Sequence, residues 1–191
     1  MLNQLLLNGI ISGSIYALIS LGFAVIYKTV RFFHFAHGIV YTAGAYFAYS
    51  LSISLGINVI LSFFLASAFS AILGIAIDRC IYLPLRKNNA PPLVFLIASF
   101  GVFIFIQNLL QLIYGAQILT LRTGVIKEGH QILGAVITDI QILILAVSCW
   151  LLVMLWFVVE RTKMGKAIRA VADDPIGASV AGIYSERVIL Y

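Results

Sequence analysis

The sequence predicts an all-α polytopic membrane protein with five transmembrane helices, the start of a sixth, and the N-terminus outside the cell. Three observations lead to this prediction. Hydrophobic residues make up 62% of the 191 residues and charged residues only 10%, whereas a soluble domain carries close to a quarter charged residues. Five long runs contain no charged residue. The basic residues lie mainly in alternate gaps between these runs.

Each run is a candidate transmembrane helix. The runs are Leu5–Tyr27, Ile39–Leu55, Ile57–Ile77, Leu93–Tyr114 and Ile140–Val159. A bilayer core of about 30 Å requires roughly 20 residues at 1.5 Å each, so every run can span it, the second only just. Val188–Tyr191 begins a further apolar run that is too short to cross, and we expect the chain to be a fragment or a truncated product.

The charges give the orientation. Ten basic residues fall on one side of the predicted bundle: Lys28, Arg31, Arg79, Arg86, Lys87, Arg161, Lys163, Lys166, Arg169 and Arg187. Only Arg122 and Lys127 fall on the other side. The positive-inside rule makes the crowded side cytoplasmic. The net charge of +5 therefore reports topology and anionic lipid, and no basic patch with exposed aromatic residues points to nucleic acid.

The first three runs carry the helix-packing signals. Gly56 and Asn58 mark the expected turn in the charge-free stretch 38–77. A re-entrant second run is the alternative, but it would place Arg79 and Arg86 opposite Lys28, so charge favours a full crossing. Small residues recur every fourth position in three sets. These sets are Gly9, Gly13 and Ala17; Gly44, Ala48 and Ser52; and Ser62, Ala66, Ser70 and Gly74. Such faces favour close helix packing and, as the second possibility, line a path.

Between the later runs we expect two loops of different character. The short proline-rich segment Asn88–Pro92 is an expected cytoplasmic turn. The outer segment Gly115–Asp139 is too long for a bare loop, and a hairpin or interfacial helix is expected there.

The cytoplasmic segment 160–187 predicts a helix, a break and a second helix. Met164, Ile168, Val171 and Ala172 recur on one helical face, with Lys166, Arg169 and Asp173 on the other. Asp174 is an N-cap before Pro175, and Gly182 is a helix-ending residue. The segment can bind a cytosolic partner or lie on anionic headgroups, and its spacing leaves both open.

The sequence offers no catalytic grouping. No charged residue lies within the runs, so no proton or ion relay is present, and no Walker A loop occurs. His34 and His37 lack further ligands for a metal site, and we expect them to hydrogen-bond backbone at a helix start. Gln107, Asn108 and Gln111 are expected to bond between helices or, alternatively, to line a polar path. Cys80 and Cys149 have no redox or metal spacing, and we expect no removable signal peptide and no cofactor.

Several stretches together resemble the inner-membrane permease family of branched-chain amino acid ABC importers. They are Gly13–Gly22, Phe35-Ala36-His37-Gly38, Asp78-Arg79 with Pro84-Leu85-Arg86, then Ile97, Gly101 and Gln107-Asn108, and Arg161–Asp174. The resemblance covers most of the chain, is weakest over Gly115–Asp139, and corresponds to the N-terminal two-thirds of family members. His34, Asp78 and Leu83 stand where the family usually has Asn, Glu and Arg.

The resemblance implies one permease domain over 1–191 in a bacterial or archaeal plasma membrane, with no enzymatic activity. It implies partners as well: ABC ATPase subunits, a second permease subunit and an extracytoplasmic solute-binding protein. Segment 160–187 would then be the ATPase-coupling segment. Its candidate residues are Met164, Gly165, Lys166, Arg169, Asp173, Asp174, Ala178 and Gly182. Ile176 departs from the acidic residue expected in the coupling motif.

Transport by alternating access is the expected function, with Tyr16, Gln107 and Asn108 as candidates for the substrate path. The cargo implied by the resemblance is a branched-chain amino acid, with another amino acid, an amide or urea left open. A stand-alone channel or carrier for a neutral polar solute, such as urea or glycerol, is the first alternative. A membrane scaffold that transports nothing is the second.

Overall fold

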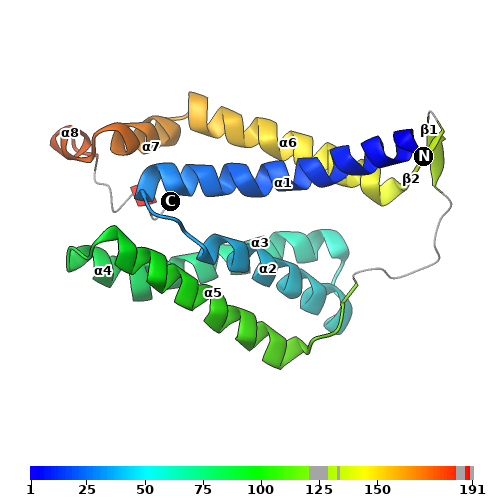
Figure 1. The fold of residues 1–191 in the computed structure, drawn as a ribbon, viewed down its shortest axis with the longest axis horizontal. Helices are drawn as coiled ribbons and strands as arrows, with labels where there is room; N and C mark the ends of the chain where they lie inside the picture. Colours follow the sequence, from blue (N-terminus) through cyan, green and yellow to red (C-terminus); the bar gives the residue numbers. More distant parts are fainter. Residues whose placement is uncertain (121–128, 133, 184–187, 190–191) are drawn as a thin grey trace. The chain divides into compact units, whose positions relative to one another are not determined.

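The computed structural model describes residues 1–120, 129–132, 134–183 and 188–189. The chain divides into two compact units. Unit 1 combines Met1–Val30 with Gly124–Ile189, and unit 2 contains Arg31–Thr123. Both consist mostly of helices (Figure 1).

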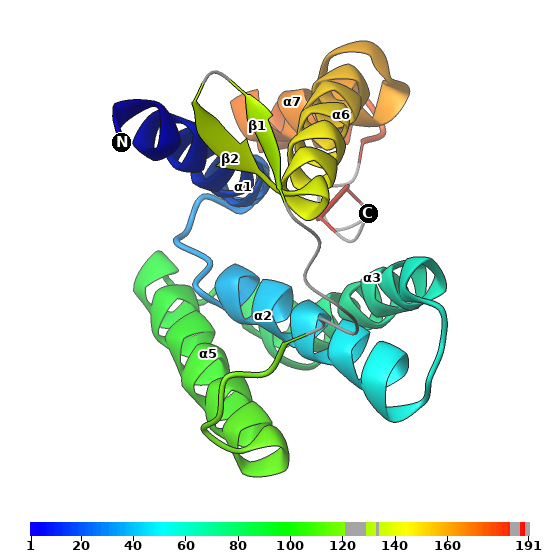
Figure 2. The ribbon, with the colours of Figure 1, turned by 90° about the vertical axis from the view of Figure 1, so that its right-hand side faces the viewer.

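Unit 1 is built on two long helices that pack along each other, α1 (Leu2–Val30) and α6 (Asp139–Arg161). The pair is visible in both Figure 1 and the end-on view of Figure 2. At the end that holds the N-terminus lies an antiparallel hairpin of β1 (His130–Ile132) and β2 (Ala135–Ile137), with Gln131 opposite Val136. The hairpin alternative for the outer segment is therefore confirmed within the described residues.

The hairpin is fastened to α1 by one side chain. The Gln4 amide donates to the Val136 carbonyl oxygen at 3.0 Å and accepts from the Val136 N–H at 2.7 Å. Gln4 thus occupies the hydrogen-bonding positions that a neighbouring strand would fill. Thr138 and Gln141 then form a capping box that starts α6.

At the opposite end of α1 and α6, unit 1 continues with α7 (Lys163–Asp173) and α8 (Pro175–Val180). The helix, break and second helix expected over 160–187 are therefore present, and their described part ends at Ile183.

Unit 2 is a layer of helices in which α2 (Ala36–Tyr49) packs against both α3 (Val59–Ile77) and α5 (Pro92–Tyr114). Figure 2 shows α2 between the other two. The expected turn at Gly56 and Asn58 is present: Gly56 has φ +64°, and the Asn58 side chain accepts from the Ile60 N–H at 2.9 Å as the N-cap of α3.

Two π-helical turns extend helices of unit 2. Ser50–Ser54 (η1) continues α2, and Asp78–Tyr82 (η2) joins α3 to α4 (Leu83–Lys87). The helix of the third run therefore continues past the charged residues to Lys87. A salt bridge between Asp78 and Arg86, at 2.9 Å, links the two ends of this extension. The wider hydrogen-bond register of a π turn also fits Pro84, which has no N–H to donate.

Small residues close the contact between α2 and α3. Ser62 and Ala66 of α3 and Ala48 of α2 are buried, and a Cβ at Gly44 would lie 2.7 Å from the Ser70 hydroxyl oxygen. The packing role expected for these two faces is confirmed. The face of Gly9, Gly13 and Ala17 on α1 is exposed within unit 1.

Four helices are long and apolar enough to cross a membrane: Leu2–Val30, Val59–Lys87, Pro92–Tyr114 and Asp139–Arg161. In α1 and α6 only 6% of the most apolar window is buried inside the protein. Apolar surface of that extent is stable in hydrocarbon, where the intrahelical bonds satisfy the backbone, and not in water. The chain is therefore a multi-pass membrane protein. Helix α2 with its η1 extension is not among these four candidates.

Candidate functional site

The first candidate site is the end of unit 1 formed by α7 and α8. Thr162 is the N-cap of α7, and its hydroxyl oxygen accepts from the Gly165 N–H at 3.1 Å. A Cβ at Gly165 would overlap the Val159 carbonyl oxygen and lie 2.5 Å from that of Val158. The backbone of α7 thus lies directly against the last carbonyl groups of α6, which only glycine permits.

Arg169 also binds the corner at which α7 meets the end of α6. Its guanidinium donates to the carbonyl oxygens of Val159 and Glu160, and it lies 3.4 Å from the Glu160 carboxylate. A cation near the C-terminus of a helix binds carbonyl groups that have no intrahelical partner. Arg169 is therefore a structural residue of the α6–α7 corner, although its spacing placed it on the polar face.

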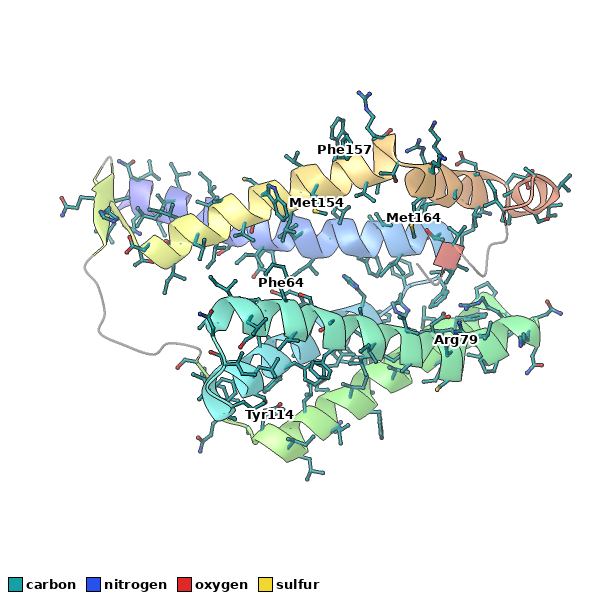
Figure 3. The ribbon with its side chains drawn as sticks, turned by 180° about the vertical axis from the view of Figure 1, so that it is seen from behind. Phe64, Arg79, Tyr114, Met154, Phe157 and Met164 are labelled. Atoms are coloured by element: carbon teal, nitrogen blue, oxygen red, sulfur yellow. The ribbon has the colours of Figure 1, made fainter. Side chains whose placement is uncertain are left out.

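The apolar face of α7 is buried within unit 1. Val171 and Ala172 are buried, Met164 and Ile168 are half-buried, and α7 contacts both α1 and α6. Figure 3 shows Met164 at the start of α7, next to the end of α6. Lys166 and Asp173, on the opposite face, are exposed. Since its apolar face is used inside the protein, α7 does not present that face to lipid headgroups.

Helix α8 is short and fixed at both ends. The Asp174 carboxylate accepts from the Ile176 N–H at 3.0 Å, which confirms the expected N-cap before Pro175. At the other end Gly182 has φ +83° and donates to the Ser179 carbonyl, while Ile183 donates to that of Ala178 at 2.9 Å. This pair of bonds is a Schellman motif, so Gly182 ends the helix as expected.

Two apolar side chains on α8 point away from the protein. Ile176 is 77% exposed and Val180 is 85% exposed, whereas Ala178 is buried. Residues four apart share one helix face, so these side chains form a small apolar patch in a segment otherwise rich in charge. Sequence reasoning missed the patch because Ile176 was read only as a departure from a motif.

The second candidate site is the Phe35-Ala36-His37-Gly38 motif at the start of α2. The preceding loop is tied to α5 by Ser99, which is fully buried. Its single hydroxyl proton is within reach of the Leu96 carbonyl oxygen at 2.8 Å and the Phe33 carbonyl oxygen at 3.1 Å, and its oxygen accepts from the Phe35 N–H at 3.4 Å. Ala36 is fully buried. Phe35 is exposed, and the Phe35 ring lies edge-on to the ring of Phe100. The motif thus begins α2 at a fixed point on α5.

His34 lies in an aromatic cluster beside this loop. Its ring lies 4.9 Å from that of Tyr82 and 5.7 Å from that of Phe32, and its buried Nδ1 has no hydrogen-bond partner among the described residues. Burial lowers the pKa of His34 from 6.5 to about 4, the charge of His37 acts in the same direction, and that of Asp78 opposes both. His34 is therefore neutral at physiological pH, and it packs as an aromatic ring rather than bonding the backbone as expected.

The third candidate site is a cavity of about 360 Å³ in unit 2. Gln107 lines it together with Thr42 and Tyr46 of α2 and Gln111 of α5. Asn108, one residue further, donates instead to the Ile104 carbonyl oxygen of its own helix at 2.7 Å. Tyr16 is 68% exposed on α1, in the other unit. Of the three path candidates, the structure thus brings only Gln107 into a polar cavity, and sequence reasoning missed Thr42 and Tyr46.

No grouping of three or more His, Cys, Asp or Glu that could hold a metal occurs among the described residues. Cys80 and Cys149 are free and exposed.

The geometry therefore defines a multi-pass membrane protein with a folded segment of two short helices, α7 and α8, and a polar cavity lined by α2 and α5. A family model described as a branched-chain amino acid transport system permease component matches residues 5–191. The chain belongs to this family of transport permeases, which are not enzymes, and it is a multi-pass protein of the inner membrane.

Curated relatives agree with this assignment. The chain is 34% identical over 198 residues to the high-affinity branched-chain amino acid transport system permease protein BraD of Pseudomonas aeruginosa. It is 34% identical to the corresponding permease protein LivH of Salmonella typhimurium over 200 residues, and of Escherichia coli K12 over 198 residues. Each match covers 97% of this chain and 64% of the relative. No solved structure matches the chain.

Proposed function

We propose that this chain is a transmembrane permease subunit of an ATP-driven ABC importer for branched-chain amino acids. The curated relatives are named as permease proteins of high-affinity branched-chain amino acid transport systems, and the chain spans about two-thirds of their length (64%). In this proposal ABC ATPase subunits supply the energy, a second permease subunit completes the path, and an extracytoplasmic binding protein delivers the solute. The two units together make one permease domain over 1–191.

The observation that carries the proposal is the construction of α7 and α8. The apolar face of α7 is buried against α1 and α6, so a displacement of this segment is transmitted to two long apolar helices. The caps fix the position of α8, which exposes Ile176 and Val180. An exposed apolar pair on a fixed helix, with charge nearby, suits a protein partner. We therefore assign ATPase coupling to segment 160–187, with Ile176 and Val180 as its apolar anchors.

The solute path is assigned to the side of α2 and α5 that carries Gln107. Thr42, Tyr46, Gln107 and Gln111 offer hydrogen-bond donors and acceptors beside apolar side chains, as a zwitterionic amino acid with an aliphatic side chain requires. Tyr16 and Asn108 remain candidates for a path completed by other helices. Five crossings with the N-terminus outside, and a sixth starting at Val188, belong to the same proposal.

The test of this function is uptake of labelled leucine by vesicles that contain the permeases, ATPases and binding protein encoded with this chain. We expect uptake that requires ATP and is lost in the double variant Ile176→Asp with Val180→Asp, together with co-purification of the ATPase. The double variant Ile176→Leu with Val180→Leu keeps the apolar patch and should retain both. Uptake without ATP or partners would contradict the proposal and favour a stand-alone carrier.

A further inference from the structure

Unit 2 contains a second cavity, an apolar groove of about 580 Å³. Helix α2 forms its floor through Ala43 and Phe47, and α3 with η2 and α5 form its two walls. On α5 the lining extends from Ala98 to Tyr114. The sixteen steps from Ala98 to Tyr114 correspond to about 24 Å along the helix, more than one leaflet of a core of about 30 Å. The groove is separate from the polar cavity that Gln107 lines.

The groove is lined by hydrocarbon side chains almost throughout. Apart from Gly101, its side chains are hydrocarbon except for the Cys80 thiol and the Tyr114 hydroxyl, and that hydroxyl is already bonded to Ser50 at 2.5 Å. Gly101 lies in the wall, and a Cβ built there meets nothing within 4 Å, so the groove is open at its middle. A solute with polar groups would find no partner here, whereas an apolar chain would.

The width of the groove favours a single hydrocarbon chain over a helix. Both α3 and α5 pack on α2, so at usual spacings of 8–10 Å their axes lie at most roughly 20 Å apart. Helices with side chains are about 10–12 Å across, which leaves a gap of at most roughly 10 Å between the walls. An acyl chain fits within that gap, and another helix can only lie across its opening.

A basic residue lies in the chain beside one end of the groove, although it is not itself a lining residue. Arg79 is adjacent to Cys80 of the lining, it is exposed, and it makes no ion pair among the described residues. It lies twenty residues after Val59, about 30 Å along the helix, which is the thickness of the bilayer core. Figure 3 shows Arg79 and Tyr114 at opposite ends of unit 2. A lipid whose tail follows α5 therefore has its headgroup at the level of Arg79.

We propose that this groove is a binding site for an anionic phospholipid, with one acyl chain along α5 and the phosphate beside the Arg79 guanidinium. Arginine is suited to phosphate because its planar donors match phosphate oxygens. The bound lipid would fill the space between the apolar walls that α3 and α5 form. This proposal is independent of the transported solute and of the direction of transport.

The test uses the full chain in nanodiscs that contain phosphatidylglycerol with a photoactivatable group near the end of one acyl chain. We expect the label on peptides of α5 between Ala98 and Tyr114. Unlabelled phosphatidylglycerol should compete about fivefold better than phosphatidylcholine, the preference that one basic residue gives near a membrane surface. Arg79→Gln should abolish the preference and keep the label.

Filling the groove with a larger side chain provides a second test of the proposal. Gly101→Phe projects a ring into the open middle of the groove and should lower the labelling several-fold. Ile97→Phe, on the same helix but outside the lining, is the matched control and should leave it unchanged. Equal competition by both lipids would overturn the proposal. Labelling spread over Ile97 and Leu112 as strongly as over the groove would overturn it too, since that result describes only annular lipid. Loss of label in the assembled transporter, together with a cross-link from Cys80 to another subunit, would also overturn the proposal, because a protein would then cover the groove.

Discussion

Gly165 is the residue at which the corner between α6 and α7 leaves no space for a side chain. Gly165→Ala would place a methyl group on the Val159 carbonyl oxygen, so α7 must move away from α6. We expect a loss of about 1–3 kcal/mol in the free energy of unfolding, typical of an overpacked site, with weaker ATPase coupling. Thermal unfolding in detergent measures the change.

The matched control for this variant is Gly13→Ala. Gly13 also lies in a helix, but nothing lies within 4 Å of the position of its Cβ. There the alanine should be neutral or stabilise by about 0.5–1 kcal/mol, because it restricts the unfolded chain. Equal destabilisation by both alanines would show that the contact at the α6–α7 corner is not the cause.

His34 links stability to pH, and the sign follows from its lowered pKa. Between pH 6.5 and about 4 the unfolded chain binds a proton at His34 that the folded chain does not, so the stability falls as the pH falls through this window. His37, Asp78 and Tyr82 are the titratable groups around it. We expect His34 to lower the free energy of unfolding by an amount on the order of 1–3 kcal/mol at pH 4, relative to pH 7.

His34→Phe separates this effect from other titrations. Phenylalanine keeps the ring contacts with Phe32 and Tyr82, and no hydrogen bond of Nδ1 is lost. Thermal midpoints measured from pH 4 to 7 should depend less on pH in this variant than in the parent chain. An unchanged slope would refute the assignment to His34.

At the scale of single elements, α8 depends on its N-cap more than the longer helices do. It has only six residues, too few to form a stable helix unaided, and the Asp174 carboxylate satisfies one of its unpaired N–H groups. Asp174→Ala should cost about 1 kcal/mol locally and reduce ATPase co-purification, while Asp174→Asn should retain both. Pull-down at increasing salt compares the three proteins, and equal binding by all of them would remove α8 from the interface.

The elements differ in how far the sequence predicts them. Charge-free runs match α1, α3, α5 and α6, because the length of an apolar run is fixed by the bilayer. Local chemistry also predicts the N-cap at Asp174 and the helix end at Gly182. The continuation of the third helix to Lys87 was not predicted. It depends on a salt bridge between residues eight apart and a π turn, neither of which follows from hydrophobic spacing.

The candidate sites were predicted less completely, because they combine residues distant in the sequence. The polar cluster at Gln107 was identified, but Thr42 and Tyr46 lie about 60 residues earlier and join it only through the packing of α2 on α5. Arg169 was assigned to a polar face by its spacing, and the structure bonds it to the end of α6. The periodicity of residues along the sequence does not predict either contact.

At the scale of the whole molecule, α2 decides the topology. Ala36–Tyr49 has 14 residues and Ser50–Ser54 has 5, together 19, or about 28 Å at the helical rise. That length just matches the bilayer core, and the segment is not among the four helices that are clear candidates for crossing it. If α2 crosses, Lys28 and Lys166 lie on the same side. If α2 is re-entrant, the two lysines lie on opposite sides, and eight of the twelve basic residues face outward against the charge bias.

Accessibility labelling of single cysteines distinguishes the two topologies. Cys80 and Cys149 are first replaced by serine, since both are free and exposed. Lys28→Cys, Leu55→Cys, Gln131→Cys and Lys166→Cys then report four connecting segments with a membrane-impermeant maleimide. Five crossings predict that Leu55→Cys and Gln131→Cys react in intact cells, and that the other two react only in inverted vesicles. If α2 is re-entrant and α3 still crosses, Leu55→Cys and Gln131→Cys both lie inside with Lys28→Cys. In that topology Lys166→Cys becomes reactive from outside. Because coupling to a cytosolic ATPase requires α7 and α8 inside, labelling of Lys166→Cys in intact cells would contradict both the five-span topology and the proposed transport mechanism.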